Sequence, residues 1–263
     1  MFDVLSSLTS MDISSIMLLL FCGLLSGLMN TLASSGSAIT LPAMIFLGVP
    51  PSVANATNRL PILIGSSISV YNFQKSKEII WKTALLMAIP MSLGVFIGTL
   101  LSEVIDAKHI EVVVFVAMIF SFIMITTNSR AILKGRSLIN KNVSIKNHIV
   151  FFFIGIWAGL IVLDSAILIL FELILGCGLD LSKANPIKNF FLFIISLISL
   201  VIFAFNHAVN WEIGFILSIG SFFGGYWGSK ISHLESVKKW IYSILTFIIV
   251  FEIITLGAKI FLP

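Results

Sequence analysis

The amino-acid sequence predicts an all-α, polytopic membrane protein built from two repeats of inverted topology. Three features predict this fold class: the composition, the length of the apolar runs and an internal repeat. Of the 263 residues, 58% are hydrophobic and 11% are charged, and the mean hydropathy is +1.10. About a quarter of the residues in a soluble domain are charged. The composition therefore excludes a water-soluble domain, and the high apolar content excludes a disordered chain.

Apolar runs of about 20 residues recur along the chain, and a helix of that length crosses about 30 Å of hydrocarbon. We expect segments at 13–33, 37–49, 54–73, 81–101, 109–127, 148–163, 165–177, 185–205, 211–230 and 238–260. Segments 37–49 and 165–177 are too short to cross upright, and each forms an interrupted or re-entrant pair with the segment before it. The first segment follows Asp3 and Asp12 rather than basic residues, which favours a retained membrane segment over a signal peptide.

An internal repeat relates the two halves of the chain at an offset of 130 residues. Between 48–102 and 178–232, 14 of 55 positions are identical without a gap, including Trp81 with Trp211. Only three of the matches are large aliphatic residues, which argues against chance similarity of apolar helices. An offset of 132 also pairs two earlier glycines, Gly23 and Gly27, with Gly155 and Gly159. We predict a first membrane repeat at 1–127, a basic linker at 128–147 and a second membrane repeat at 148–263.

Basic residues predict the orientation, because cytoplasmic loops of membrane proteins carry an excess of Lys and Arg. The densest basic cluster lies in the linker 128–147, which we therefore place in the cytoplasm. Counting spans outward puts further basic residues on that side: Lys75, Lys77, Lys82, Lys183, Lys230, Lys238 and Lys239. Both termini are then extracytoplasmic, and the two halves have opposite orientations. Inverted repeats with interrupted helices are an architecture of multi-pass transporters in the cell membrane.

A polar break joins the first two segments. It reads Asn30-Thr31-Leu32-Ala33-Ser34-Ser35-Gly36-Ser37. Glycine and serine tolerate irregular backbone, and either Ser35 or Ser37 is placed to cap the next helix. The start of that helix would present N–H groups and a positive dipole end, which suits an anion, with the hydroxyls and the Asn30 amide as further donors. The alternative is a plain turn that binds nothing.

The second break differs from the first, because Val162-Leu163-Asp164-Ser165 stands where the repeat predicts a glycine–serine stretch. A charge at membrane depth costs ~2.5–3.5 kcal/mol on insertion scales, so Asp164 needs a partner, water or a proton. We consider two compatible interpretations. Asp164 is either a coupling group for a proton or cation, or a structural cap for segment 165–177.

Two cations stand about one turn inside apolar segments of the two halves. Arg59 follows Thr57 and Asn58, and Lys188 precedes Asn189. The planar guanidinium fork of arginine matches a sulfonate or carboxylate, whereas lysine acts as a point charge. The alternative is that both long side chains extend to the membrane interface. The nearly equivalent repeat positions favour a functional pair.

Other chemistry is not supported by the sequence. The four histidines lie far apart without the spacing of metal ligands, and no nucleophile elbow, phosphate loop or nucleic-acid patch is present. We therefore expect no enzyme, no metal, no cofactor and no nucleic-acid partner. The expected partners are a small anionic substrate and the lipid bilayer, and a homodimer is left open.

At this point the residues indicate a family. The stretch from Gly27 to Pro42, followed by Ala54-Asn55-Ala56-Thr57-Asn58-Arg59, resembles the TauE/SafE sulfite exporter family. In that family the first stretch is similar to an N-T-x-A-G-G-G-G run that ends in T-L-P, and the second to A-x-G-T-N-K. The resemblance implies export or uptake of small sulfur-containing anions, driven by an ion gradient. It also implies that these residues match the family's motif positions: Asn30, Thr31, Gly36, Thr57, Asn58, Arg59 and Lys188.

Two differences from the family's sequence pattern affect the expected substrate more than the expected architecture. Serines replace most of the family's glycine run, and the second glycine-rich stretch is missing around Asp164. The expected substrate site lies between the two breaks and the two cations. It comprises Asn30, Thr31, Ser34, Ser35, Gly36, Ser37, Thr57, Asn58, Arg59, Ser165, Lys188 and Asn189, with Asp164 as the coupling candidate. The alternatives to a secondary transporter are an uncoupled channel for anions or small solutes and a membrane scaffold that transports nothing.

Overall fold

The computed structural model describes residues 12–32, 36–104, 144–163 and 165–232, together with 234 and 250. Every regular element in this part of the chain is a helix. Three of the described helices are long and apolar enough to cross a membrane: Ile13–Leu32, Trp81–Leu101 and Leu181–Phe205. The predicted all-helical fold is therefore confirmed for the described residues, and the three long apolar helices support a membrane protein by their length and composition. Segment 109–127, most of segment 238–260 and linker residues 128–143 lie outside the described residues.

The first half contains five described helices, and one predicted segment is divided in two. The helices are α2 (Ile13–Leu32), α3 (Ser37–Phe46), α4 (Pro51–Thr57), α5 (Arg59–Lys75) and α6 (Trp81–Leu101). Helix α4 begins with proline at its first position, where the missing N–H would have had no helical partner. The predicted segment 54–73 is interrupted at Asn58, which ends α4 and precedes α5.

The second half contains four described α-helices and one π-helical turn. They are α9 (Ile145–Leu160), α10 (Ser165–Phe171), the π-helix η1 (Glu172–Gly176), α11 (Leu181–Phe205) and α12 (Trp211–Ile231). Helix α11 begins four residues before the predicted segment, because the Asp180 carboxylate accepts a hydrogen bond from the Lys183 backbone N–H at 2.9 Å. Helix α9 begins three residues early, where Ser144 and Asn147 form a capping box.

Glycines bring two pairs of helices into close parallel contact. A Cβ on Gly27 of α2 would lie 2.4 Å from the Ser221 carbonyl oxygen of α12. A Cβ on Gly98 of α6 would lie 2.0 Å from the Ile156 carbonyl oxygen of α9. Along each contact, residues further along one helix meet residues further along the other helix, so the paired helices run in the same direction. These glycines therefore allow close helix packing of the small-residue type found in membrane proteins.

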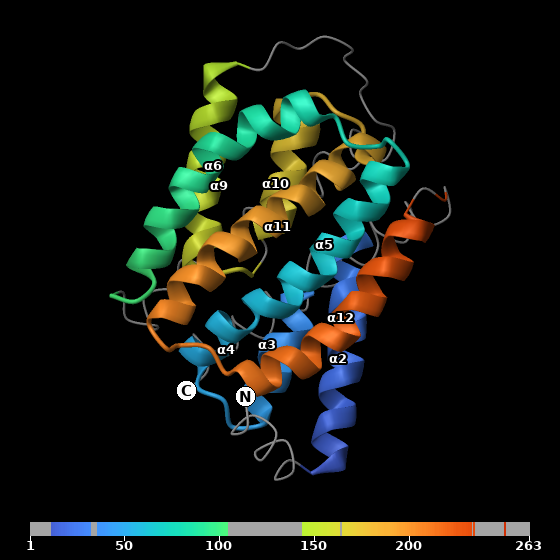
Figure 1. Ribbon diagram of the computed structural model, residues 1–263. Coiled ribbons are helices and arrows are strands. Elements are labelled where there is room, and N and C mark those ends of the chain that lie inside the picture. The colour runs from blue at the N-terminus through green and yellow to red at the C-terminus, as the bar shows by residue number, and fades with distance from the viewer. Residues whose placement is uncertain are drawn as a thin grey trace.

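The close pairs join helices from different halves, so the chain packs as two composite bodies (Figure 1). We define the α2 body as α2, α3, α4, α5 and α12, and the α9 body as α6, α9, α10, η1 and α11. Helix α5 of the α2 body packs against α11 of the α9 body, and we call this interface between the two bodies the seam. The packing unit is therefore not a sequence half.

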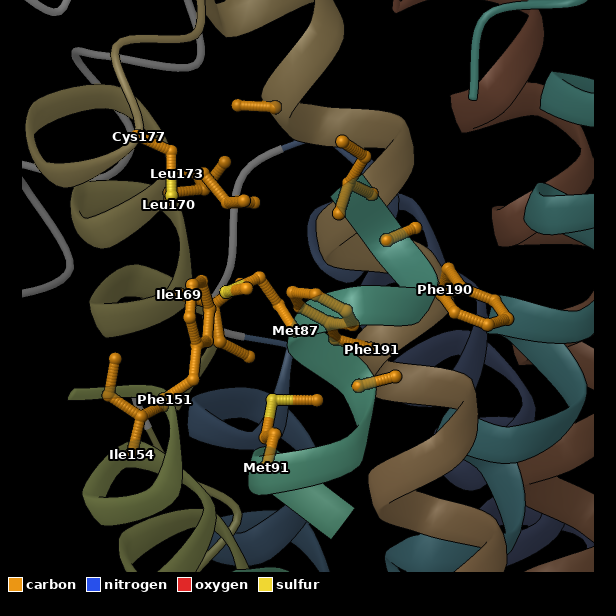
Figure 2. Packing of buried hydrophobic residues seen from close by; sticks show 14 of the residues in the cluster. Met87, Met91, Phe151, Ile154, Ile169, Leu170, Leu173, Cys177, Phe190 and Phe191 are labelled. Atoms are coloured by element: carbon orange, nitrogen blue, oxygen red, sulfur yellow. The ribbon is translucent and has the colours of Figure 1, made fainter. Parts of the chain in front are cut away.

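The largest apolar core lies within the α9 body and extends across the seam to a few residues of the α2 body (Figure 2). Met87 and Met91 of α6 point toward residues of α9, α10 and α11, and Phe151 packs edge-on against Phe191 with ring centroids 5.4 Å apart. The outer helix faces expose large apolar residues such as Phe21 and Phe96. An apolar exterior of this kind suits contact with lipid.

Candidate functional site

The break after α2 is organised by the side chain of Asn30. Its Oδ1 accepts a hydrogen bond from the Gly36 backbone N–H at 3.0 Å, which identifies the other side-chain atom as the amide nitrogen. That nitrogen is buried and has no hydrogen-bond partner among the described residues. A Cβ at position 36 would lie 2.6 Å from the Asn30 side chain and 2.4 Å from the Ser26 carbonyl oxygen, so glycine is required there. Ser34 and Ser35 lie outside the described residues.

Asn58 connects the α4–α5 junction to the start of α3. Its Oδ1 accepts a hydrogen bond from the Thr40 hydroxyl at 2.6 Å, and its Nδ2 donates to the Ser37 hydroxyl at 3.0 Å. All three side chains are buried. The expectation that Ser37 caps α3 is wrong, because Ser37 is the first residue of the helix and the N-cap is Gly36, which has no side chain to cap with. The Ser37 hydroxyl holds Asn58 in place instead.

Arg59 is fully buried at the start of α5, and its terminal nitrogens bind the last turn of α9. Nη1 donates to the Ala158 carbonyl at 2.7 Å, and Nη2 donates to the Gly159 carbonyl at 3.0 Å. The carbonyls of a final helical turn have no partner in their own helix and carry the negative end of its dipole. The alternative that this side chain extends to the membrane interface is therefore wrong for Arg59.

The rest of the Arg59 guanidinium is enclosed by less specific contacts. Its carbon centre lies 5.7 Å from the centre of the Phe203 ring, and its Nε has no hydrogen-bond partner among the described residues. Beside it, Asn55 of α4 donates to the Leu160 carbonyl at 3.2 Å. Three consecutive carbonyls at the end of α9 are thus bound by two side chains of the α2 body.

Lys188 and Asn189 of α11 likewise donate hydrogen bonds to the backbone carbonyls at the end of α2. The fully buried Lys188 ammonium donates to the carbonyls of Asn30 at 2.5 Å and Thr31 at 3.4 Å. The Asn189 amide donates to the Thr31 carbonyl at 3.2 Å and to the Asn185 carbonyl at 3.0 Å. Lys188 does not extend to the interface either, since none of its surface is exposed.

The structure brings most of the described candidate residues together at the two breaks. The group at the end of α2 contains Asn30, Thr31, Gly36, Ser37, Asn58, Lys188 and Asn189. Arg59 lies at the end of α9, and the Ser165 hydroxyl donates to the Val162 carbonyl at 2.9 Å in the following turn. The Thr57 hydroxyl is used elsewhere, because it accepts a hydrogen bond from the Asn210 backbone N–H at 2.9 Å. Asp164 lies outside the described residues.

Two participating residues were not among the predicted site residues, namely Thr40 and Asn55. Thr40 stands one helical turn after Ser37, so both hydroxyls meet Asn58. Asn55 is one of the identities of the internal repeat, where it pairs with Asn185. The recurrence of a polar residue at equivalent positions of two apolar segments is the sequence signal that singles out Asn55. That signal does not indicate that its side chain binds a backbone carbonyl.

The buried polar groups at the breaks include hydrogen-bond donors that no described residue uses, the Asn30 amide nitrogen and the Arg59 Nε. No cluster of three or more histidine, cysteine or acidic side chains that could hold a metal ion occurs in the described ranges. The Asn30 amide nitrogen and the Arg59 Nε are therefore the donors left over at the two breaks after the described hydrogen bonds are made.

Comparisons with known proteins agree with a transporter. The family model of the sulfite exporter TauE/SafE matches residues 19–253. The probable membrane transporter protein ORF9 of a Sinorhizobium species is 23% identical over 222 residues, which cover 81% of this chain and 82% of the relative. A probable membrane transporter protein of Haemophilus influenzae is 24% identical over 228 residues, with 84% and 87% covered. No solved structure matches the chain at a significant level.

The family match includes both breaks and both buried cations, and the relatives are named as membrane transporters rather than enzymes. The chain belongs to the TauE/SafE sulfite exporter family of membrane transporters.

Proposed function

We propose that this protein is a secondary active transporter that moves a small anion across the cytoplasmic membrane by alternating access. The observation that carries the proposal is the environment of the Arg59 guanidinium. Its guanidinium is fully buried, and its partners are neutral carbonyls and an aromatic ring, with no carboxylate partner among the described residues. Burying a charge without a counter-charge is unfavourable. An anionic substrate near this group would compensate part of that cost.

The substrate class follows from the donors and the family description. Sulfite and organosulfonates carry several acceptor oxygens around sulfur, and the two unused donors at the breaks can each bind one. The family description names sulfite export. Sulfite, an organosulfonate or a related sulfur-containing anion is therefore the proposed substrate.

Equivalent contacts support an inverted repeat in this transporter. Asn189 donates to the Thr31 carbonyl as Arg59 donates to the Gly159 carbonyl, and Asn189 is the repeat counterpart of Arg59 at an offset of 130. Arg59 at the start of α5 also lies near Phe203 at the end of α11, so these two repeat-related helices run in opposite directions where they meet. Opposite direction is what inverted repeats require.

The first helices of the two repeats correspond at a smaller offset than the sequence alone suggests. Thr31 and Gly159 accept equivalent bonds, which corresponds to an offset of 128 rather than 132. Downstream, Gly48 and Gly178 both have positive φ, 85° and 74°, at an offset of 130. Helices α3 and α10 begin at Ser37 and Ser165, still at an offset of 128. The two extra residues of the second repeat therefore fall between Ser165 and Gly178, an interval that contains the π-helix Glu172–Gly176. A π-helical turn accommodates additional residues without ending the helix.

The proposal is tested with purified protein in proteoliposomes. We expect saturable uptake of sulfite or a small organosulfonate that is stimulated by an imposed pH gradient and accelerated by substrate on the opposite side. Arg59→Gln should strongly reduce this uptake, while Lys75→Ala, which removes an exposed cation from the same helix, should not. Flux that neither saturates nor shows exchange would indicate a channel. Absence of any anion flux would indicate a scaffold.

Asp164 is the proposed coupling group, and its role has a separate test. In the variant Asp164→Asn, exchange of anion across the membrane should persist while stimulation by the pH gradient disappears. Wild-type stimulation in this variant would exclude Asp164 as the coupling group and leave it as a structural cap.

A further inference from the structure

We infer that the units that move during transport are the two composite bodies, and that four positioning residues hold them together through the carbonyls of the interrupted helices. The inference rests on the proposed transport function. Its residues are Asn55 and Arg59, which we call the α9 latch, and Lys188 and Asn189, which we call the α2 latch. Asn55 has no role in the function proposed above.

The two latches supply the hydrogen bonds that join described residues across the seam. Six hydrogen bonds between described residues join the α2 body to the α9 body, and the four latch side chains donate all six. The other long-range side-chain hydrogen bonds between described residues remain inside one body. For example, Asn72 binds Ser229 at 2.8 Å within the α2 body, and Thr99 and Ser199 lie 2.8 Å apart within the α9 body.

The latches are reciprocal. The α9 latch belongs to the α2 body and binds the end of α9, whereas the α2 latch belongs to the α9 body and binds the end of α2. The acceptors occupy the same place in both helices. Asn30 and Thr31 precede the last residue of α2, Leu32, as Ala158 and Gly159 precede the last residue of α9, Leu160.

Physical chemistry explains why these contacts control motion. In an apolar environment the last carbonyls of an interrupted helix need donors, and here each helix obtains donors from the opposite body. The seam is otherwise built from apolar side chains, such as the cluster of Ile62 from the α2 body with Val162, Ala166 and Leu192. Apolar side chains can slide past each other at low cost, but separating a latch leaves a cation and carbonyls unpaired unless water enters. Each latch can therefore open only when its own side of the seam is hydrated.

The inference is tested by thiol accessibility, which does not depend on knowing the substrate. In a background with Cys22→Ala and Cys177→Ala, Leu192→Cys reports on the seam, where Leu192 is 2% exposed. Leu217→Cys reports on the interior of the α2 body, where Leu217 is fully buried against Gly23. The rate of labelling by a small water-soluble maleimide is measured at both positions in proteoliposomes.

The latch variants are Asn55→Leu and Arg59→Gln, and the matched control is Asn72→Leu, which removes a hydrogen bond inside one body. A hydrogen bond to a charged group is worth about 1.5–3 kcal/mol, so Arg59→Gln should raise labelling of Leu192→Cys about tenfold or more. Asn55→Leu, which retains the charge of Arg59, should raise it by a smaller factor. Labelling of Leu217→Cys should not change, and Asn72→Leu should have no effect at Leu192→Cys.

Equal increases at both reporter cysteines would indicate general loosening and overturn the inference, as would wild-type labelling of Leu192→Cys in both latch variants. If Arg59→Gln does not fold, Asn55→Leu alone decides the result. If the wild-type protein transports no anion but the labelling pattern is as expected, the proposed substrate fails while the two-body motion stands.

Discussion

The Lys188 ammonium donates a hydrogen bond to the Asn30 carbonyl at 2.5 Å, although 158 residues separate the two positions in the chain. This bond joins α11 of the α9 body to the end of α2. The same Asn30 uses its side chain to bind the Gly36 N–H at 3.0 Å and so shapes the start of α3. One residue therefore links a buried cation to the break at which we propose that the anion binds.

Replacing Lys188 with methionine should destabilise the protein and abolish transport. The substitution removes the donor of the Asn30 carbonyl while keeping the volume of the side chain. A buried acceptor left without its partner costs about 1–3 kcal/mol. We expect a lower midpoint of thermal unfolding in detergent and no anion uptake. The control Lys230→Met, at an exposed position of α12, should leave both measurements unchanged; an unchanged midpoint for Lys188→Met would contradict the structure.

Conservative and neutral substitutions of Arg59 should differ in a defined order. Lysine retains the charge but cannot donate in parallel to both the Ala158 and Gly159 carbonyls, whereas glutamine loses the charge. Uptake should decrease from wild type to Arg59→Lys to Arg59→Gln, with the maximal rate falling more than the apparent affinity. The measurement is initial uptake as a function of anion concentration. Full activity of Arg59→Gln would exclude a role for the charge.

Changing Asn30 to aspartate separates substrate binding from the local fold. The carboxylate can still accept the hydrogen bond from the Gly36 N–H, but it loses the unused donor and adds a negative charge. We expect the concentration for half-maximal uptake to rise about tenfold or more, the effect of losing ~1.4 kcal/mol of binding free energy. Ligand-induced thermal stabilisation provides an independent reading of affinity. Unchanged affinity would show that this amide does not contact the anion.

An alanine at Gly98 should disrupt the contact between α6 and α9. Its Cβ would lie 2.0 Å from the Ile156 carbonyl oxygen, so the helices would have to separate. Such overpacking costs about 1–3 kcal/mol, measured by unfolding in denaturant. The control is Gly214→Ala, whose Cβ would meet the flexible Leu60 side chain at 3.1 Å. Equal effects of the two substitutions would contradict the parallel packing of α6 on α9.

Helix positions followed from the sequence more reliably than helix partners. The boundaries of α2, α6 and α12 are local properties of apolar runs, and the structure has them within one residue of the predicted segments. The errors occurred where polar side chains set a boundary. The chain is interrupted at Asn58, whose side chain binds Thr40 and Ser37, and Asp180 caps α11 about one turn before the predicted start. Apolar periodicity does not record such polar contacts.

The sequence alone determined that this is a helical membrane protein, that the chain breaks before α3 and α10, and that cations lie inside apolar segments. Only the tertiary structure decided what those cations bind. Arg59 and Lys188 were expected to face a substrate, and their described partners are carbonyls at the ends of α9 and α2. The reason is physical: backbone carbonyls have the same chemistry at every position. Which ones need a distant donor depends on which helix ends are buried together, and that is a property of packing rather than of any local pattern.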